Sequence, residues 1–312
     1  MKQQEVISVS KLIREVLKDD IPIIIELLQQ VLGNGDYLYL SRLGGLTNRS
    51  YKVTMKNHAE YLVRIPGFGT ERLINRLDER KSNELACKLG LDSKLLYFSD
   101  DGKKVMTFIP NVQETTKEQL KKMENISQAA NIFRKLHTCG EDTGVRFEVF
   151  EMAAMYEHLI DIGGVKLYID YLDIKRTVMT IKTEVDANGI AKRVPCHNDS
   201  LVDNWVLSSK GKLYLIDWEY SGMNEPMWDL SCLSIEAEYS EVEDSILLEY
   251  YFQHEPTIDE KKRFLAAKLY VDYLWTLWGL TRVPYDGQFM QEYADGRYLR
   301  LKRNIEAYNK VM

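Results

Sequence analysis

Residues Cys196–Glu219, CHNDSLVDNWVLSSKGKLYLIDWE, decide the fold. They hold a histidine, three aspartates, two asparagines and a glutamate between short apolar runs. NWVL and KLYLID predict two strands of a hairpin that turns at Lys210-Gly211. This pairing places Asn204, at the start of one strand, beside Asp217, at the end of the other. The sequence therefore predicts that an amide oxygen and a carboxylate meet at the open end of the hairpin.

That pair of oxygen ligands suits Mg²⁺, a hard ion that takes few protein ligands, keeps waters and completes its shell with substrate phosphates. Asp199 precedes Asn204 by five residues. From that loop its carboxylate could accept a proton from an attacking hydroxyl group, because a general base needs reach before it needs a tuned pKa. The alternative is a polar hairpin whose Asp and Asn side chains only cap turns.

The segments HNDSLVDN and LIDWE resemble the catalytic loop and the metal-binding aspartate of protein-kinase-like phosphotransferases. The resemblance implies that His197 and Asp199 occupy the HxD positions of that family. It also implies that Asn204 and Asp217 are the two metal ligands, with ATP and Mg²⁺ as the bound cofactors.

The rest of the chain divides into a β-rich first third and an α-rich remainder. Three strands are expected from Tyr37 to Val63, a helix from Glu71 to Leu89 and a hairpin turning at Asp101-Gly102. We expect an α+β, protein-kinase-like bilobal fold with the active site in the cleft between the lobes. The N-terminal lobe would span residues 1–109, with a helical lead-in over 1–35, and the C-terminal lobe would span 110–312.

A glycine-rich turn is the candidate for holding nucleotide phosphates. In LGGLTNRSY, Gly44 and Gly45 would let backbone N–H groups approach phosphate, and Thr47, Asn48 and Arg49 can add donors. The turn departs from the GxGxxG of protein kinases. It is similar to the corresponding loop of choline and ethanolamine kinases.

Further nucleotide-binding residues follow from the same resemblance. Arg64, in YLVRIPG, stands where protein kinases carry lysine, and its guanidinium can bind phosphate oxygens. A helix carboxylate should hold this cation; Glu79 is the choice by offset, with Glu84 as its rival. Phe108 and Ile109, in MTFIP, would form the hinge that meets adenine through backbone groups.

The segment IDWEYSGMNEPMWDLSCLSIEAEY resembles choline/ethanolamine kinases of bacterial type. It implies that Asp229 braces the catalytic loop. Choline cannot donate a hydrogen bond from its nitrogen, so its site needs aromatic faces and a nearby anion. Two tryptophans three residues apart share a helix face, which is also common in core packing. The acceptor-binding residues implied by the resemblance are Tyr220, Glu236, Trp275, Trp278 and Tyr298.

Composition and charge exclude several other classes. The chain has 312 residues, 45% of them hydrophobic, and a net charge of −6 without a basic block, so we expect no nucleic-acid partner. The four cysteines form no CxxC pair and are expected to be reduced thiols. The N-terminal region lacks the order of a signal peptide, and its run Ile21–Ile25 is too short to insert into a membrane. The expected location is the cytoplasm, and the oligomeric state is left open.

Three alternatives to a choline kinase remain open from the sequence. Ethanolamine is one alternative acceptor. An aminoglycoside is another, because EAEYSEVEDSILLEY offers many carboxylates to a polycation. A non-enzymatic sensor that kept the fold is the third, although the intact Asp199, Asn204 and Asp217 argue against it.

Overall fold

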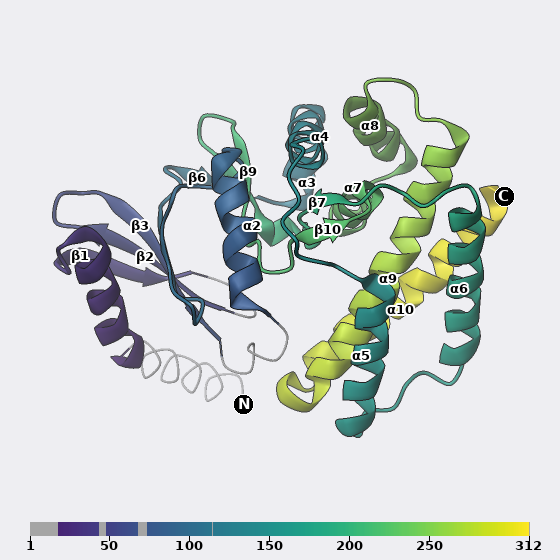
Figure 1. Ribbon diagram of the computed structural model, residues 1–312, viewed down its shortest axis with the longest axis horizontal. Helices are drawn as coiled ribbons and strands as arrows, with labels where there is room; N and C mark the ends of the chain where they lie inside the picture. The colour runs from purple at the N-terminus through teal and green to yellow at the C-terminus, as the bar shows by residue number, and fades with distance from the viewer. Residues whose placement is uncertain (1–17, 44–47, 68–73, 114, 312) are drawn as a thin grey trace. The chain divides into compact units, whose positions relative to one another are not determined.

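The computed structural model describes residues 18–43, 48–67, 74–113 and 115–311 (Figure 1). The chain forms two compact units, one of residues 1–113 with 208–211 and one of residues 114–207 with 212–312. The sequence predicts a division after residue 109, whereas the first unit extends to Gln113 and includes a later hairpin tip. The backbone N–H of Ser209 at that tip donates to the carbonyl of Asn111.

The first unit contains a five-stranded antiparallel sheet in the order β1-β2-β3-β5-β4. The three strands expected in the first third and the hairpin at Asp101-Gly102 are confirmed. The turn of that hairpin depends on Gly102, whose φ of 89° is costly for any other residue. The strands of this unit are β1 (Tyr37–Arg42), β2 (Asn48–Met55), β3 (Glu60–Pro66), β4 (Leu95–Phe98), β5 (Lys104–Thr107) and the short β6 (Val112–Gln113).

Two helices pack on this sheet. Helical residues 18–32 bury Ile24 and Leu28 against Tyr51, Val53 and other apolar residues of β2 and β3. Helix α2 (Arg76–Lys88) begins where Asn75 accepts hydrogen bonds from two backbone N–H groups of the first turn. Figure 1 shows the two helices, purple and blue, within the first unit.

The second unit is mainly helical. Helix α9 lies at its centre and packs against α10, α5 and α7 (Figure 1). Sixteen consecutive or near-consecutive residues of α9 are buried, which is typical of a helix surrounded by other elements. The helices of this unit are α3 (Lys117–Leu120), α4 (Met123–His137), α5 (Val149–Ile162), α6 (Tyr171–Ala187), α7 (Pro226–Glu236), α8 (Glu241–Phe252), α9 (Ile258–Asp286) and α10 (Gln288–Val311).

Two short antiparallel strand pairs hold the segment quoted at the start. β7 (Val194–Cys196) pairs with β10 (Gly222–Asn224), and β8 (Trp205–Ser208) pairs with β9 (Leu213–Leu215). The predicted hairpin is therefore confirmed, with its turn at Gly211, where φ is 75°. The turn η2 (Val202–Asn204) leads into β8. Within the described ranges, no helix combines the length and apolar character needed to cross a bilayer.

The fold class is thus the expected one, a small sheet-containing N-terminal lobe and a larger helical C-terminal lobe.

Candidate active site

The loop after β7 has an unusual backbone that a buried amide network holds in place. Asn198 has φ of 69°, a left-handed conformation that asparagine tolerates better than most residues. Its side-chain nitrogen donates to the carbonyls of Tyr220 (3.0 Å) and Gly222 (3.3 Å), and its oxygen accepts from Asn224 (3.0 Å). The loop is therefore bound to the strand that pairs with β7.

Asp229 braces this loop from the first turns of α7. One of its carboxylate oxygens accepts the backbone N–H of His197 and the other accepts that of Asn198, both at 2.7 Å. Asp229 is fully buried. Trp228, its neighbour, donates from its indole to the carbonyl of Asn198 at 2.8 Å. These contacts give Asp229 the geometry expected of a brace. Pro226 begins α7, which suits proline because the first turn needs no N–H donor.

A histidine that the sequence analysis did not single out also holds Asp229. His137, at the end of α4, lies with Nε2 at 3.0 Å from Asp229 and Nδ1 at 2.9 Å from the Tyr251 hydroxyl. The carboxylate of Asp229 accepts from Nε2–H, and Nδ1 shares a hydrogen bond with the Tyr251 hydroxyl. The loop after β7 is thereby linked through Asp229 to helices α4 and α8.

His197 is buried, and both of its ring nitrogens make hydrogen bonds to the backbone. Its Nδ1 accepts the backbone N–H of Asp199 at 3.3 Å, so Nε2–H donates to the carbonyl of Ile216 at 2.9 Å. Burial lowers the pKa of the imidazole, although Asp229 acts in the opposite direction. The neutral ring packs edge-on against Trp218. These contacts support the structural role predicted for His197.

Asp199 and Asn204 are joined directly. The Asn204 side-chain nitrogen donates to the main-chain oxygen of Asp199 at 2.7 Å and to its carboxylate at 3.3 Å. The same residue accepts the backbone N–H of Ile216 at 2.9 Å, so it lies across the hairpin from the residue before Asp217. The amide nitrogen is committed to Asp199, which leaves the amide oxygen as the atom suited to a metal ion.

The charges around Asp199 favour a divalent cation. Burial raises the pKa of Asp199 well above its usual range, and the carboxylates of Asp217, Glu219 and Glu236 raise it further, against a lowering effect of Arg297. Asp217 has φ of 65°, a strained conformation that recurs at functional sites. Carboxylate and amide oxygens are the ligands that Mg²⁺ prefers, so the residues present fit that ion.

In the first unit, Arg64 of β3 pairs with Glu79 of α2, as predicted by offset. Both side chains are buried, with exposures of 2% and 1%. Arg64 also donates to the carbonyl of Gly102 at 3.1 Å. The rival Glu84 instead pairs with Arg80 on the exposed face of the helix at 3.0 Å. The choice of Glu79 over Glu84 is therefore confirmed.

Two further buried cations surround Glu79. Arg76 Nη1 lies 2.6 Å and Lys104 Nζ 3.6 Å from the carboxylate. Burial alone would raise the pKa of Glu79, but Arg64, Lys104 and Arg76 lower it below its usual value. Guanidinium and ammonium groups are the side chains that bind phosphate oxygens, so these three cations are candidates for that role.

Replacing Glu79 with Gln is expected to destabilise the protein by about 3 kcal/mol at neutral pH, because it leaves buried cations without their anion. The folded-state pKa of Glu79 is depressed, so its stabilising effect is present above the unfolded pKa and is lost as pH falls through the folded pKa. The gap between wild type and Glu79→Gln should therefore narrow on acidification. Urea unfolding followed by circular dichroism at several pH values measures this gap.

The matched control is Glu84→Gln, on the same helix but in an exposed ion pair. It should change stability by no more than about 0.5 kcal/mol. Equal stability of the two variants at neutral pH would contradict the role given to Glu79.

The remaining predicted nucleotide-binding residues have mixed outcomes. Gly44, Gly45 and Thr47 lie outside the described residues. Asn48 is buried at the first position of β2, and its nucleotide-binding role stays a prediction. Arg49, expected as a phosphate donor, instead donates to Asp20 at 2.8 and 3.1 Å, which holds helical residues 18–32 to the sheet.

At the predicted hinge, one of the backbone groups expected to meet adenine already has a hydrogen bond. The backbone N–H of Phe108 donates to the carbonyl of Glu60 at 3.0 Å, so this N–H is already committed within the first unit. The ring of Phe108 lies under Lys52 at 4.5 Å, and Ile109 is buried. Adenine recognition by this segment stays a prediction.

In the second unit, four rings form what we call the aromatic cluster: Tyr220, Trp275, Trp278 and Tyr293. The two tryptophan rings of α9 are 5.9 Å apart and nearly perpendicular. Tyr220 contacts Trp275 at 5.2 Å, and Tyr293 of α10 contacts Trp278 at 5.8 Å. The predicted rings Tyr220, Trp275 and Trp278 are thus brought together, and Tyr293 joins them without having been predicted.

The cluster contains buried polar atoms that call for a ligand or water. Among the described residues, the indole N–H of Trp275 has no hydrogen-bond partner although the residue is 3% exposed. The Tyr220 hydroxyl and the Trp278 indole N–H also lack a hydrogen bond of standard geometry in that part of the chain. Burial raises the pKa of Tyr220, and Tyr156, Glu219 and Asp199 add to the rise, while Trp278 opposes it. Asp199 thus lies within electrostatic range of the cluster.

Glu236, the predicted anion, ends α7 and has a partner of its own. Arg297 of α10 donates to it at 2.7 Å. Burial would lower the pKa of Arg297, but Glu236, Tyr293 and Asp272 raise it, so the guanidinium stays charged. The acceptor's cation would therefore meet a carboxylate that is already partly neutralised.

Tyr298 has different surroundings from those expected. Its ring stacks on Tyr168 at 3.9 Å, its hydroxyl donates to Asp170 at 2.7 Å, and Lys302 lies over the ring. Tyr298 and Tyr293 are five residues apart on α10, so they point to different sides of the helix. Tyr293 contacts Trp278, whereas the stacked neighbour of Tyr298 is Tyr168; the acceptor-binding role of Tyr298 stays a prediction.

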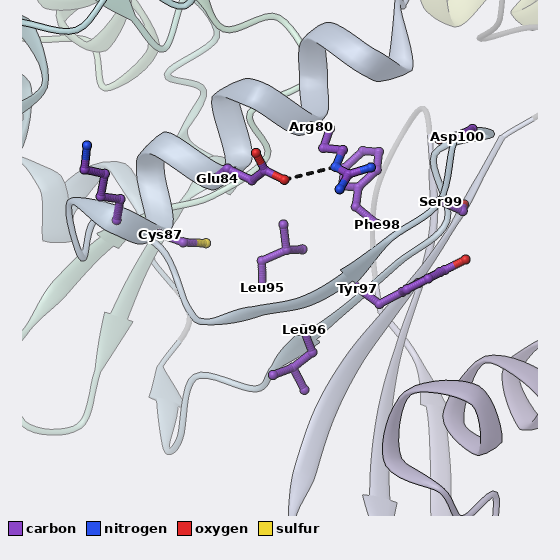
Figure 2. A pocket seen from close by; sticks show the side chains of 10 residues that line it. Arg80, Glu84, Cys87, Leu95, Leu96, Tyr97, Phe98, Ser99 and Asp100 are labelled. Atoms are coloured by element: carbon purple, nitrogen blue, oxygen red, sulfur yellow. Dashed lines mark hydrogen bonds and ion pairs between the residues drawn. The ribbon is translucent and has the colours of Figure 1, made fainter.

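A cavity of about 690 Å³ lies in the first unit between α2 and the edge strand β4 (Figure 2). Figure 2 shows the Arg80–Glu84 pair on one wall and Leu95 pointing toward α2 from the other. The buried face of α2, with Glu79, is not part of its lining. This cavity is therefore separate from the Arg64–Glu79 pair and is not the predicted nucleotide site.

Comparison with known proteins agrees with this geometry. The family model for choline/ethanolamine kinase matches residues 41–276. Protein LicA of Haemophilus influenzae is 27% identical over 261 residues, which are 81% of this chain and 76% of that protein. The structure is similar to choline kinase LicA from Streptococcus pneumoniae, with 32% identity, a TM-score of 0.79 and coverage of 92% and 99% of the two chains. It is also similar to LicA in complex with AMP, with 31% identity, a TM-score of 0.77 and coverage of 92% and 98%.

Proposed function

Because the chain belongs to the choline/ethanolamine kinase family, we propose that it transfers the terminal phosphoryl group of ATP to the hydroxyl group of choline, with Mg²⁺ bound. Members of this family are phosphotransferases that act on an alcohol group, and this chain is one of them. The products would be phosphocholine and ADP.

The second unit would supply the reacting groups. Asp199 accepts the proton of the choline hydroxyl group. In the same step the choline oxygen forms a bond to the terminal phosphorus of ATP, and the bond between that phosphorus and the leaving ADP oxygen breaks. Asn204 and Asp217 would hold Mg²⁺, which neutralises charge on the phosphates when bound. Asp229 and His197 keep the loop in position through the backbone contacts described above.

The first unit would bind the nucleotide. The cations around Glu79 would bind phosphate oxygens, with Arg64 at the position where protein kinases carry lysine. Asn48 and the glycine turn before it would add donors. The solved LicA complex with AMP supports nucleotide binding by a relative of this chain.

The aromatic cluster is the observation that carries the choice of choline. A quaternary ammonium has no N–H donor and is bound best by ring faces, and four rings gather within electrostatic range of the presumed base. Burial raises the pKa of Tyr293, and Asp199 and Glu236 are among the charges that raise it further. An acceptor with its hydroxyl at Asp199 would place its cationic end at these rings.

The acidic segment EAEYSEVEDSILLEY, which suggested an aminoglycoside as an alternative acceptor, has few carboxylates available to bind a polycation. Glu238 pairs with Lys117, Glu243 caps α8 at Ser240, and Asp244 pairs with Lys268. These carboxylates stabilise helices and their packing. We therefore keep choline as the proposed acceptor.

The direct test is an assay of ADP formation with purified protein, ATP and a panel of choline, ethanolamine and an aminoglycoside, with Mg²⁺ and after its removal by chelation. The proposal expects Mg²⁺-dependent turnover that is highest with choline. Preference for another acceptor would refute the choice of choline, and turnover in chelator would refute the metal assignment.

Replacing Trp278 with Leu is expected to raise the KM for choline by about tenfold or more, because a desolvated cation–ring contact contributes up to about 2 kcal/mol. The value of kcat should change less, since the ring lies at the cationic end of the acceptor. Steady-state kinetics with choline as the varied substrate measures both constants.

Trp278→Phe, which keeps a ring face, is the control and should retain most of the affinity. A KM in Trp278→Leu equal to that of wild type would exclude this ring from the acceptor site.

A further inference from the structure

Arg297 occupies a position between the proposed cation site and its anion. It is 3% exposed, its Nη2 lies 2.7 Å from Glu236, and its Cζ lies 4.6 Å from the centre of the Tyr293 ring. Tyr293 in turn contacts Trp278 at 5.8 Å. A permanent positive charge is thus built into the edge of the aromatic cluster.

A second buried ion pair holds this arrangement in place. Asp272 of α9 is fully buried and accepts from Arg300 at 2.7 Å, from Asn304 at 3.1 Å and, more weakly, from Arg297 at 3.5 Å. Two carboxylates therefore face two guanidinium groups. Because the charges balance, Glu236 presents little net negative charge to an incoming ligand.

We propose that Arg297 sets the acceptor preference: by neutralising Glu236 it favours a quaternary ammonium, bound by ring faces, over a primary ammonium that needs carboxylate acceptors. The proposal rests on the proposed function, because it concerns the acceptor of that same site.

The physical reason is the difference between the two cations. A primary ammonium carries three N–H donors and is strongly hydrated, so burial without acceptors leaves donors unsatisfied and weakens binding. A trimethylammonium group has no donors, so it loses nothing when the nearby carboxylate is occupied. Arg297 thereby penalises the competing acceptor more than the preferred one.

The test compares kcat/KM for choline with kcat/KM for ethanolamine in four variants. Arg297→Gln removes the neutralising charge, and Arg297→Lys keeps it. Glu236→Gln removes the anion, and Arg300→Gln removes a guanidinium from the same network that lies 3.9 Å from Glu236 and bonds chiefly to Asp272. Thermal unfolding confirms that each variant is folded.

Arg297→Gln should lower the ratio of kcat/KM for choline to kcat/KM for ethanolamine by about tenfold. This is the effect expected when one N–H donor of a bound primary ammonium gains an acceptor. Glu236→Gln should shift the ratio in the opposite direction, because it removes the remaining carboxylate oxygen that a primary ammonium could use. Arg297→Lys and Arg300→Gln should both stay close to the wild-type ratio. A purely structural role would impair both acceptors alike and would leave the ratio unchanged.

An unchanged ratio in folded Arg297→Gln, or equal shifts in Arg297→Gln and Glu236→Gln, would overturn the proposal. If Arg297→Gln does not fold, Glu236→Gln decides alone: a raised ratio supports the proposal, and an unchanged or lowered ratio refutes it. Failure of the proposed function is a different result, namely wild-type protein that phosphorylates neither acceptor.

Discussion

Asp199→Asn is expected to lower kcat with choline by about 10³-fold, because it removes the proposed general base without changing side-chain size. The side chain accepts a hydrogen bond from Asn204 at 3.3 Å, and the stronger bond, at 2.7 Å, goes to the main chain of Asp199 and survives the change. The loop should therefore keep its shape. Single-turnover and steady-state assays of phosphocholine formation measure the loss.

Two comparisons make this result specific. Nucleotide affinity, measured by calorimetry, should remain close to wild type, since the cation cluster of the first unit is untouched. Asp203→Asn makes the same chemical change on the neighbouring turn, where the side chain is exposed, and should retain nearly full turnover. An Asp199→Asn enzyme with more than about a tenth of wild-type kcat would remove Asp199 from the role of base.

Asp229→Ala is expected to cost about 3–5 kcal/mol of stability, because two buried backbone N–H groups and His137 lose a common acceptor. In the molecules that remain folded, the loop would shift relative to the metal ligands. A displacement of about 1 Å at the reacting groups lowers turnover by about 10²-fold. Thermal unfolding and kcat at low temperature separate the two effects.

The control for this variant is Asp173→Ala, in an exposed ion pair on α6. It should leave both stability and turnover nearly unchanged. If Asp229→Ala instead unfolds at the wild-type temperature, its carboxylate does not brace the loop.

Local sequence signals predicted much of the architecture. Alternating apolar residues and glycine at turns were sufficient for the strands of the first unit and for the hairpin of β8 and β9, because these contacts join neighbouring segments. The pairing of Arg64 with Glu79 also followed, from a family pattern with a fixed offset.

Other site residues could not be predicted because their roles depend on contacts between distant segments. His137 meets Asp229 across 92 residues, and Arg297 meets Glu236 across 61. A histidine or arginine inside an amphipathic helix gives no local sign of such a partner. The contact of Tyr293 with Trp278 could not be predicted for a related reason, since the rotation of α10 is set by its packing on α9.

Helix α7 carries Asp229 in its first turns and Glu236 at its last residue. At about 1.5 Å per residue, the seven-residue interval separates them by about 10 Å along one rigid rod. The helix therefore links the residue that anchors the loop after β7 to the carboxylate that pairs with Arg297. Because neither residue can move along the helix without the other, a substitution that displaces α7 should disturb the loop and this carboxylate together.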